Sequence, residues 1–337
     1  MIMITTTTLS REAELVIFYN LLIQTVSRVL DGFIWIVGHI GALCICIVFS
    51  QPAFRKSPCT IYFIASSISQ ILLFNFAVFI RMIQYGYDVP VNSLSVWFCR
   101  IRYYMFYVSA ANARYNIIFA GIDRFLCSYQ NTRLRKWSSP KIAFPVIIIN
   151  AIIWILFYIQ VMVYFGVVSG KCRTTNETFR RYFNVYVTIE NGFFPIAPML
   201  IFGLLTIRNI QMSRHRVKAT VSPIDGTQPI ANPGSQKKET QLHKMLANQV
   251  IVYIIFNIPY PGYSVYRTYF LNSSSLSGSD ALRDTFLNNL FYDFIYLGYA
   301  VTCLNFIYTS AMFRRELKQV IQKIIFCQFR RNITPKT

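Results

Sequence analysis

The chain has 337 residues, of which 54% are hydrophobic and only 14% are charged, whereas soluble globular chains carry about a quarter of charged residues. Lysine and arginine outnumber aspartate and glutamate by 33 to 13. In a soluble protein this excess would suggest nucleic acid binding, but in a membrane protein it reflects basic cytoplasmic loops. The composition therefore excludes a soluble enzyme and favours an integral helical membrane protein with no nucleic acid partner.

Apolar runs of about 20 residues, the length that crosses a bilayer core, recur along the chain. They predict seven membrane spans at about 33–50, 60–81, 99–124, 142–165, 185–208, 246–269 and 285–312. Residues 1–32 are predicted to form an outer segment that either stands apart from the first helix or lengthens it, because Arg28 and Asp31 interrupt its apolar stretch. The predicted fold is an all-α seven-transmembrane helix bundle.

The basic residues indicate the orientation of the bundle. The segments that share one side are 51–59, 124–141, 208–244 and 313–337, and they hold 21 of the 33 lysines and arginines. Because cytoplasmic loops collect these residues, the N-terminus is predicted to be extracellular and the C-terminus cytoplasmic. We expect a multi-pass protein of the plasma membrane, with the first span as its targeting signal.

Two sequons, at Asn176 and Asn272, fall in loops that this topology places outside the cell, where they are candidates for N-glycosylation. The tail 313–337 is predicted to begin with an amphipathic helix on the membrane surface, and Cys327 at its end is a candidate for palmitoylation. The apolar residues of this helix recur at helical spacing: Phe313, Leu317, Val320, Ile321, Ile324 and Ile325.

The third span carries a cysteine at its outer end and an acid–base pair at its inner end. From Cys99 to Asp123 the chain runs 24 residues, roughly 36 Å of helix and one full crossing. A second cysteine, Cys172, lies in the next outer loop, so a Cys99–Cys172 disulfide is expected in the oxidising exterior. The alternative is that the two thiols are unrelated.

Taken together, the seven spans, the two outer cysteines and the Asp123-Arg124-Phe125 sequence resemble a rhodopsin-like G-protein-coupled receptor, of a divergent kind similar to invertebrate peptide receptors. Phe125 stands where that family usually has tyrosine. The resemblance continues along nearly the whole chain, in Trp154, Pro198, Pro259 and the "FRREL" sequence at 313–317.

The resemblance implies that Arg124 pairs with Asp123 at rest and reaches Glu239 near the inner end of the sixth helix. Activation would move that helix outward and free Arg124 to face a heterotrimeric G protein. Tyr308 is the candidate for the family's seventh-helix tyrosine; alignment on Phe313 would instead put Phe306 there. The alternative is a structural role without signalling, in which Arg124 is an interfacial anchor that extends to lipid headgroups.

Several polar positions of the family are replaced here. Ala42 stands for an asparagine, Gln70 for an aspartate and Asn257 for a tryptophan, while Leu304 and Asn305 stand for an Asn-Pro pair. These replacements leave open a receptor that binds its ligand with weak or no G-protein coupling.

The expected ligand is peptide-like, because basic and aromatic residues gather at the outer ends of the spans. An amine is not favoured, since Phe106 and Tyr107 stand where amine receptors have aspartate. The candidate pocket residues are Arg102, Phe106, Tyr107, Glu190, Tyr263, Arg267 and Asp293. No cofactor or metal site is expected, because His39, His215 and His243 lack metal-ligand spacing with a cysteine or carboxylate, and the enzyme interpretation is weak for the same reason.

Arg114, Glu190 and Asp293 are predicted to lie within the membrane, where ionisable residues are functional candidates. They either form structural salt bridges or line a pathway. A seven-helix channel or transporter is therefore the competing class, although the chain shows none of the internal repeats of inverted-repeat transporters.

Overall fold

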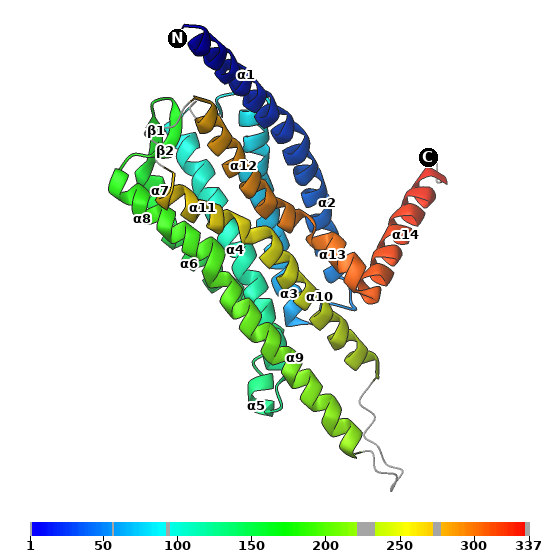
Figure 1. The fold of residues 1–337 in the computed structure, drawn as a ribbon. Helices are drawn as coiled ribbons and strands as arrows, with labels where there is room; N and C mark the ends of the chain where they lie inside the picture. The colour runs from blue at the N-terminus through cyan, green and yellow to red at the C-terminus, as the bar shows by residue number, and fades with distance from the viewer. Residues whose placement is uncertain (1, 56, 92–94, 221–232, 272–277, 334–337) are drawn as a thin grey trace.

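The computed structural model describes residues 2–55, 57–91, 95–220, 233–271 and 278–333, and Figure 1 shows a bundle of long helices with a β-hairpin at one end. The elements are α1 (Ile2–Val26), α2 (Gly32–Phe49), α3 (Pro58–Leu73), α4 (Val96–Ser128), α5 (Thr132–Arg135), α6 (Pro140–Phe157), α7 (Ile159–Tyr164), β1 (Phe165–Val168), β2 (Lys171–Thr174), α8 (Glu177–Thr188), α9 (Phe194–Thr220), α10 (Pro233–Asn257), α11 (Pro259–Tyr269), α12 (Gly278–Ala300), α13 (Thr302–Thr309) and α14 (Ala311–Ile333).

Short π-helical turns and small bends link most of the helices into seven rods within the described residues. Helices α5 and α14 and the β-hairpin lie outside these rods. The rods are α1–α2, α3 with its π-helical extension to Gly86, α4, α6–α7, α8–α9, α10–α11 and α12–α13. The prediction of an all-α seven-helix bundle is confirmed. The hairpin β1–β2 was not predicted; its tip at Ser169 and Gly170 has positive φ values of 52° and 70°, a conformation that glycine adopts without steric cost.

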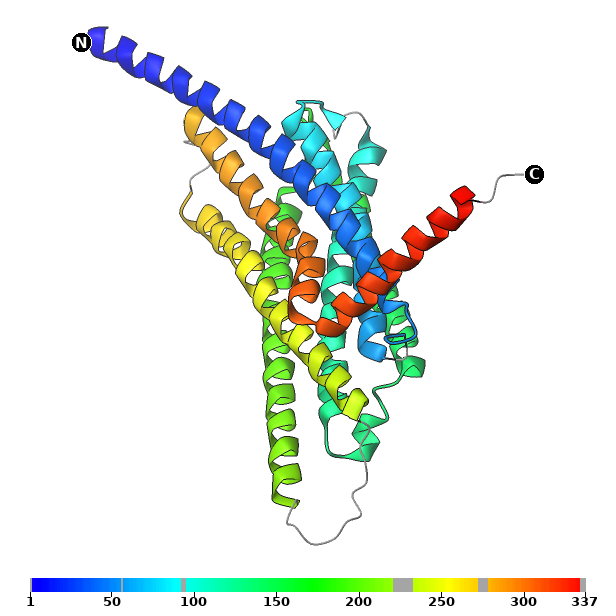
Figure 2. The same cartoon turned by 90° about the vertical axis from the view of Figure 1, so that its right-hand side faces the viewer.

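The first rod is longer than its predicted span. Helix continues from Ile2 to Phe49 through a π-helical turn at Ser27–Asp31, so residues 2–32 lengthen the first helix rather than stand apart from it. The seventh rod begins earlier than predicted, at Gly278, and also ends earlier, at Thr309: the backbone at Ser310 is extended (φ −123°, ψ 111°) and α14 begins at Ala311. In Figure 2, α14 leaves the bundle and points away from it.

Within the part of the chain that the structure describes, four helical stretches are long and apolar enough to cross a membrane, and a fifth qualifies if the α12–α13 pair, bent by 42°, counts as one span. The four are Arg11–Phe49, Pro58–Gly86, Pro140–Tyr164 and Glu177–Asn209. Helix α4 falls short because it carries polar residues, but Ser109, Asn112, Arg114 and Asn116 are all buried against neighbouring helices. A central helix that other helices shield from lipid does not need an apolar surface.

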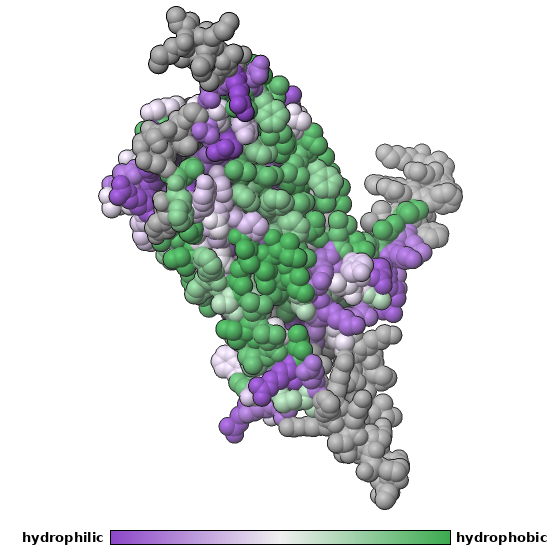
Figure 3. All heavy atoms as spheres, viewed as in Figure 1, coloured by the Kyte–Doolittle hydropathy of each residue, from purple (hydrophilic) through white to green (hydrophobic). Residues whose placement is uncertain are grey.

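Apolar side chains cover the flank of the bundle that Figure 3 shows, and hydrophilic residues gather towards its two ends. One end carries the β-hairpin and the start of α1; the other carries α5 and the facing ends of α9 and α10 (Figure 1). We call them the hairpin end and the α5 end. An aromatic cluster of Phe49, Phe54, Phe63, Phe306 and Phe313 fills the core near the α5 end and anchors α14 to the bundle.

Candidate functional site

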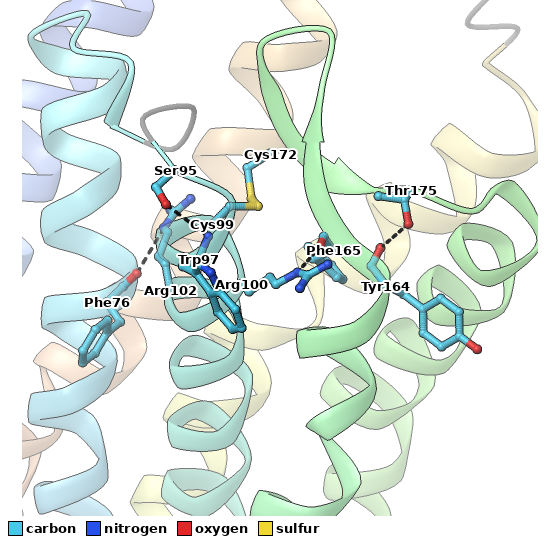
Figure 4. The surroundings of a disulfide bond; sticks show 10 residues. All are labelled: Phe76, Ser95, Trp97, Cys99, Arg100, Arg102, Tyr164, Phe165, Cys172 and Thr175. Atoms are coloured by element: carbon cyan, nitrogen blue, oxygen red, sulfur yellow. Dashed lines mark hydrogen bonds between the residues drawn. A yellow bond between two sulfur atoms is a disulfide. The ribbon is translucent and has the colours of Figure 1, made fainter.

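The β-hairpin is fixed to the start of α4. Cys99 and Cys172 form a disulfide with their Cα atoms 5.7 Å apart, within the usual range for such a bond. Figure 4 shows that Arg100 adds a second link, its Nε donating a hydrogen bond of 2.9 Å to the carbonyl of Phe165. Thr175 closes the base of the hairpin through its amide, which donates to the carbonyl of Tyr164 at 2.8 Å. These links hold the hairpin across the hairpin end of the bundle.

Replacing Cys172 by serine is expected to destabilise the folded protein. The disulfide closes a loop of 73 residues, and the chain-entropy estimate for such a loop is about 4 kcal/mol. The melting temperature of the purified variant should fall clearly, together with its amount at the cell surface. Cys46→Ser, at a free half-buried cysteine of α2, is the control and should change neither quantity. Equal melting temperatures for Cys172→Ser and wild type would contradict the expectation.

A cavity of about 830 Å³ lies beneath the hairpin, a volume typical of ligand sites. Four predicted pocket residues line it: Arg102, Phe106, Tyr107 and Arg267. The full lining is Ala77, Arg81, Tyr85, Arg102, Tyr103, Phe106, Tyr107, Phe165, Cys172, Arg173, Thr174, Glu177, Arg180, Arg181, Phe183, Asn184, Val185, Arg267, Leu271, Asn288, Tyr292 and Tyr296. Six arginines thus face a single carboxylate, that of Glu177.

Tyr292 and Tyr296 of α12 are lining residues that sequence reasoning missed. Together with Asn288 they recur every four residues, so they lie on one face of the helix, and that spacing was the signal that could have found them. Tyr292 also accepts or donates a hydrogen bond of 2.7 Å with Tyr260 of α11. This contact joins the sixth and seventh rods at the wall of the cavity.

Tyr263 and Asp293 are two predicted pocket residues that do not line the cavity. Each of them contacts either a lining arginine or a residue that pairs with one. The Tyr263 hydroxyl donates to Asp284 at 2.7 Å, and the same aspartate pairs with Arg267 at 2.7 Å. Asp293 pairs with Arg81 at 3.3 Å, both side chains being almost fully buried. Both residues therefore position an arginine that lines the cavity.

Glu190 lies deeper, in an ion pair that crosses the centre of the bundle. Its Oε1 is 2.6 Å from Nη2 of Arg114, and the Tyr158 hydroxyl donates to its Oε2 at 3.2 Å. The side chains of Arg114 and Glu190 are only 2% and 4% exposed. The pair joins α4 to the π-helical turn between α8 and α9, so the structure brings together two of the three intramembrane charges that the sequence singled out.

At the α5 end, Asp123 and Arg124 form an ion pair of 2.6 Å between Oδ2 and Nη2, and both are buried. Asp123 also accepts a hydrogen bond of 2.7 Å from Ser138, which follows α5, while Arg124 donates to Ser57 at 3.4 Å. The Phe125 side chain takes no part in this pair and packs against α9, its ring centroid lying 5.6 Å from that of Phe202. The acid–base pair thus has contacts with the segments before α3 and after α5.

Of the other residues predicted to act with Arg124, Tyr308 points away from the bundle and Glu239 stays a prediction. Tyr308 is 84% exposed on the outside of α13, whereas Phe306 is fully buried in the aromatic cluster. Phe306 therefore occupies the inward position, because residues two apart on a helix are rotated by about 200° and lie on opposite faces. Glu239 belongs to α10, but its side chain lies outside the described residues.

Polar side chains join the sixth and seventh rods around Asn305, which stands at one of the replaced positions. Asn305 of α13 donates a hydrogen bond of 2.9 Å to Gln249 of α10, and Gln249 donates to Thr302 at 3.2 Å. Asn248 is a further partner of Asn305. Sequence reasoning noted Asn305 but missed its amide partners on α10, which no spacing within one helix could reveal.

The modification candidates are only partly described. Asn176 is exposed and caps α8, its Oδ1 accepting a hydrogen bond of 3.1 Å from the amide of Phe179. Asn272 and the side chain of Cys327 lie outside the described residues. Among the side chains that the structure describes, no group of three His, Cys, Asp or Glu residues is placed to hold a metal ion.

The fold agrees with a comparison against protein families. The pattern of the rhodopsin family of seven-transmembrane receptors matches residues 41–308, which is most of the chain. The chain therefore belongs to this family, and its class is that of the multi-pass membrane receptors known as G-protein-coupled receptors. No curated protein matches the chain significantly.

Proposed function

We propose that the chain is a plasma-membrane receptor whose hairpin end is extracellular, that it binds a peptide in the cavity beneath the hairpin, and that it activates a heterotrimeric G protein at the α5 end. The orientation rests on the 21 basic residues in the segments at the α5 end and in the tail. It puts the Cys99–Cys172 disulfide in the oxidising exterior and Arg124 at the cytoplasmic side.

The cavity is the observation that carries the proposal. Its wall combines aromatic side chains, which supply large contact areas, with arginines that recognise acidic and carbonyl groups. A peptide offers both kinds of partner. A small amine would meet six arginines and one acid, and the net positive charge of the wall disfavours a cation.

Signalling would require the α10–α11 rod to move. Asp123–Arg124 is a closed ion pair, and α10 contacts α13 through the amides around Asn305. We infer that an outward shift of α10 exchanges these contacts for contacts with the G protein, a change that needs only a few kcal/mol of differential ligand binding.

The channel alternative loses its main support in the pairing of the intramembrane charges. Arg114 is neutralised by Glu190, and Arg81 by Asp293, so each of the three intramembrane charges that the sequence singled out has a partner within the bundle. Charges that bind one another in this way stabilise helix contacts and are not free to coordinate a passing ion.

Screening a library of neuropeptides on cells that express the chain tests the proposal. We expect at least one peptide to evoke a concentration-dependent change in cyclic AMP or calcium that cells without the chain do not show. Inhibition of G proteins should remove this response. A peptide-evoked membrane current that persists under that inhibition would contradict the proposal and support the channel class.

A further inference from the structure

The six arginines of the cavity differ in what they bind. Arg81 and Arg267 pair with Asp293 and Asp284. Arg180 and Arg181 share Glu177, and Arg173 is an exposed side chain that donates to the Ser169 hydroxyl. Arg102 is the exception: it is only 5% exposed, yet no carboxylate of the described residues pairs with it.

The recorded contacts of Arg102 leave its charge without a counter-ion among the described residues. Its Nε donates a hydrogen bond of 3.3 Å to the carbonyl of Phe76, as Figure 4 shows, and its guanidinium carbon lies 4.8 Å from the ring centroid of Tyr103. Both contacts orient the guanidinium, but neither neutralises it. Because a buried cation is costly without an anion, this arrangement favours the binding of an anion from the cavity.

The surroundings of Arg102 select the kind of anion. Phe106 follows one helical turn deeper on α4, and Tyr107 stacks on Tyr158 beside it, with ring centroids 5.4 Å apart. The nearest lining side chains on α4 are therefore aromatic. A planar guanidinium next to aromatic rings suits a carboxylate attached to an apolar or aromatic group, since the guanidinium fork binds both carboxylate oxygens at once.

We propose that Arg102 is the anchor for a carboxylate of the ligand, either the free C-terminus of a peptide or an aspartate or glutamate side chain, and that Phe106 and Tyr107 hold the adjoining apolar group. The proposal rests on the proposed function in placing the ligand in this cavity. It adds the chemical class that the ligand must contain and the residue that recognises it.

Thermal stability of the purified receptor in increasing concentrations of three probes tests the proposal without any G protein. N-acetylphenylalanine carries a terminal carboxylate, and N-acetylphenylalanine amide is the same molecule without the charge. N-acetyl-aspartyl-phenylalanine amide carries its only carboxylate on a side chain. A probe that binds the folded receptor raises its melting temperature, and a tighter probe does so at a lower concentration.

We expect wild type to be stabilised by a carboxylate probe at a concentration at least tenfold lower than by the uncharged amide, the factor typical of a hydrogen-bonded charge. Tighter binding of N-acetylphenylalanine would indicate a C-terminal carboxylate in the ligand. Tighter binding of N-acetyl-aspartyl-phenylalanine amide would indicate an acidic side chain. Arg102→Gln should abolish the preference for acid over amide, and Arg102→Lys should retain a reduced preference, because lysine keeps the charge but loses the fork.

Arg283→Gln is the matched control, since it also removes one positive charge from the hairpin end, at an exposed side chain that does not line the cavity. It should behave as wild type. Equal responses of wild type to acid and amide, no response to either acid, or an unchanged preference in both Arg102 variants would each overturn the proposal. If the receptor signals in response to peptides but gives one of these results, the proposed function stands and only the role of Arg102 as an anchor is wrong.

Discussion

Replacing Arg114 by methionine or Glu190 by leucine is expected to destabilise the receptor strongly. Each substitution leaves the partner charge buried in the centre of the bundle, where both side chains are at most 4% exposed. Breaking a buried ion pair from one side costs about 3–5 kcal/mol. The melting temperature of each purified variant should therefore fall by many degrees.

The double variant Arg114→Met with Glu190→Leu separates the ion pair from simple packing. Because both charges are removed together, no unpaired charge remains, and most of the lost stability should return. Glu177→Gln is the control: it breaks an exposed ion pair with Arg180, where water screens the charges, and should have little effect. If the double variant is as unstable as the sum of the two single variants, the charge pairing is not what stabilises this site.

Arg124→Ala is expected to abolish G-protein signalling while leaving peptide binding unchanged, because Arg124 lies at the α5 end and the cavity lies beneath the hairpin. If Glu239 makes the ionic contact with Arg124 that the family resemblance implies, Glu239→Ala should act in the opposite direction and raise ligand-free signalling several-fold, since a contact worth about 1 kcal/mol shifts a two-state equilibrium by that factor. Second-messenger levels at equal surface expression measure both effects.

The opposite changes in signalling expected for Arg124→Ala and Glu239→Ala distinguish a contact that controls activation from an interfacial anchor. An arginine that only extends to lipid headgroups would change expression without changing signalling per receptor. Ser128→Ala, which removes a hydrogen bond between the end of α4 and Asn209 of α9, is a local control that leaves the charges in place. Unchanged basal and stimulated signalling in both Arg124→Ala and Glu239→Ala would show that Arg124 is an anchor.

The sequence predicted the features that depend on one segment at a time. Apolar runs placed the seven rods, and the common sidedness of Cys99 and Cys172 placed the disulfide that the structure contains. Helical spacing also predicted the tail helix, which begins two residues earlier than expected, at Ala311.

Features that depend on how one helix is rotated against another could not be predicted. Arg114 and Glu190 are 76 residues apart and meet only because α4 and the fifth rod face each other. Tyr308 and Phe306 differ by two residues, yet a rotation of α13 buries one and exposes the other. The β-hairpin was missed because Phe165–Thr174 has no extended apolar alternation of its own and is held by the disulfide and Arg100.

Nucleotide exchange on purified heterotrimeric G proteins decides whether the chain activates them. Receptor in lipid nanodiscs would be mixed with each major class of G protein and an active peptide from the library, and the uptake of a non-hydrolysable GTP analogue would be followed. We predict that wild type accelerates exchange on at least one class when the peptide is present, and that Arg124→Ala does not. If wild type binds the peptide but exchange matches that of empty nanodiscs for every class, the chain does not activate a G protein and the proposed signalling function is wrong.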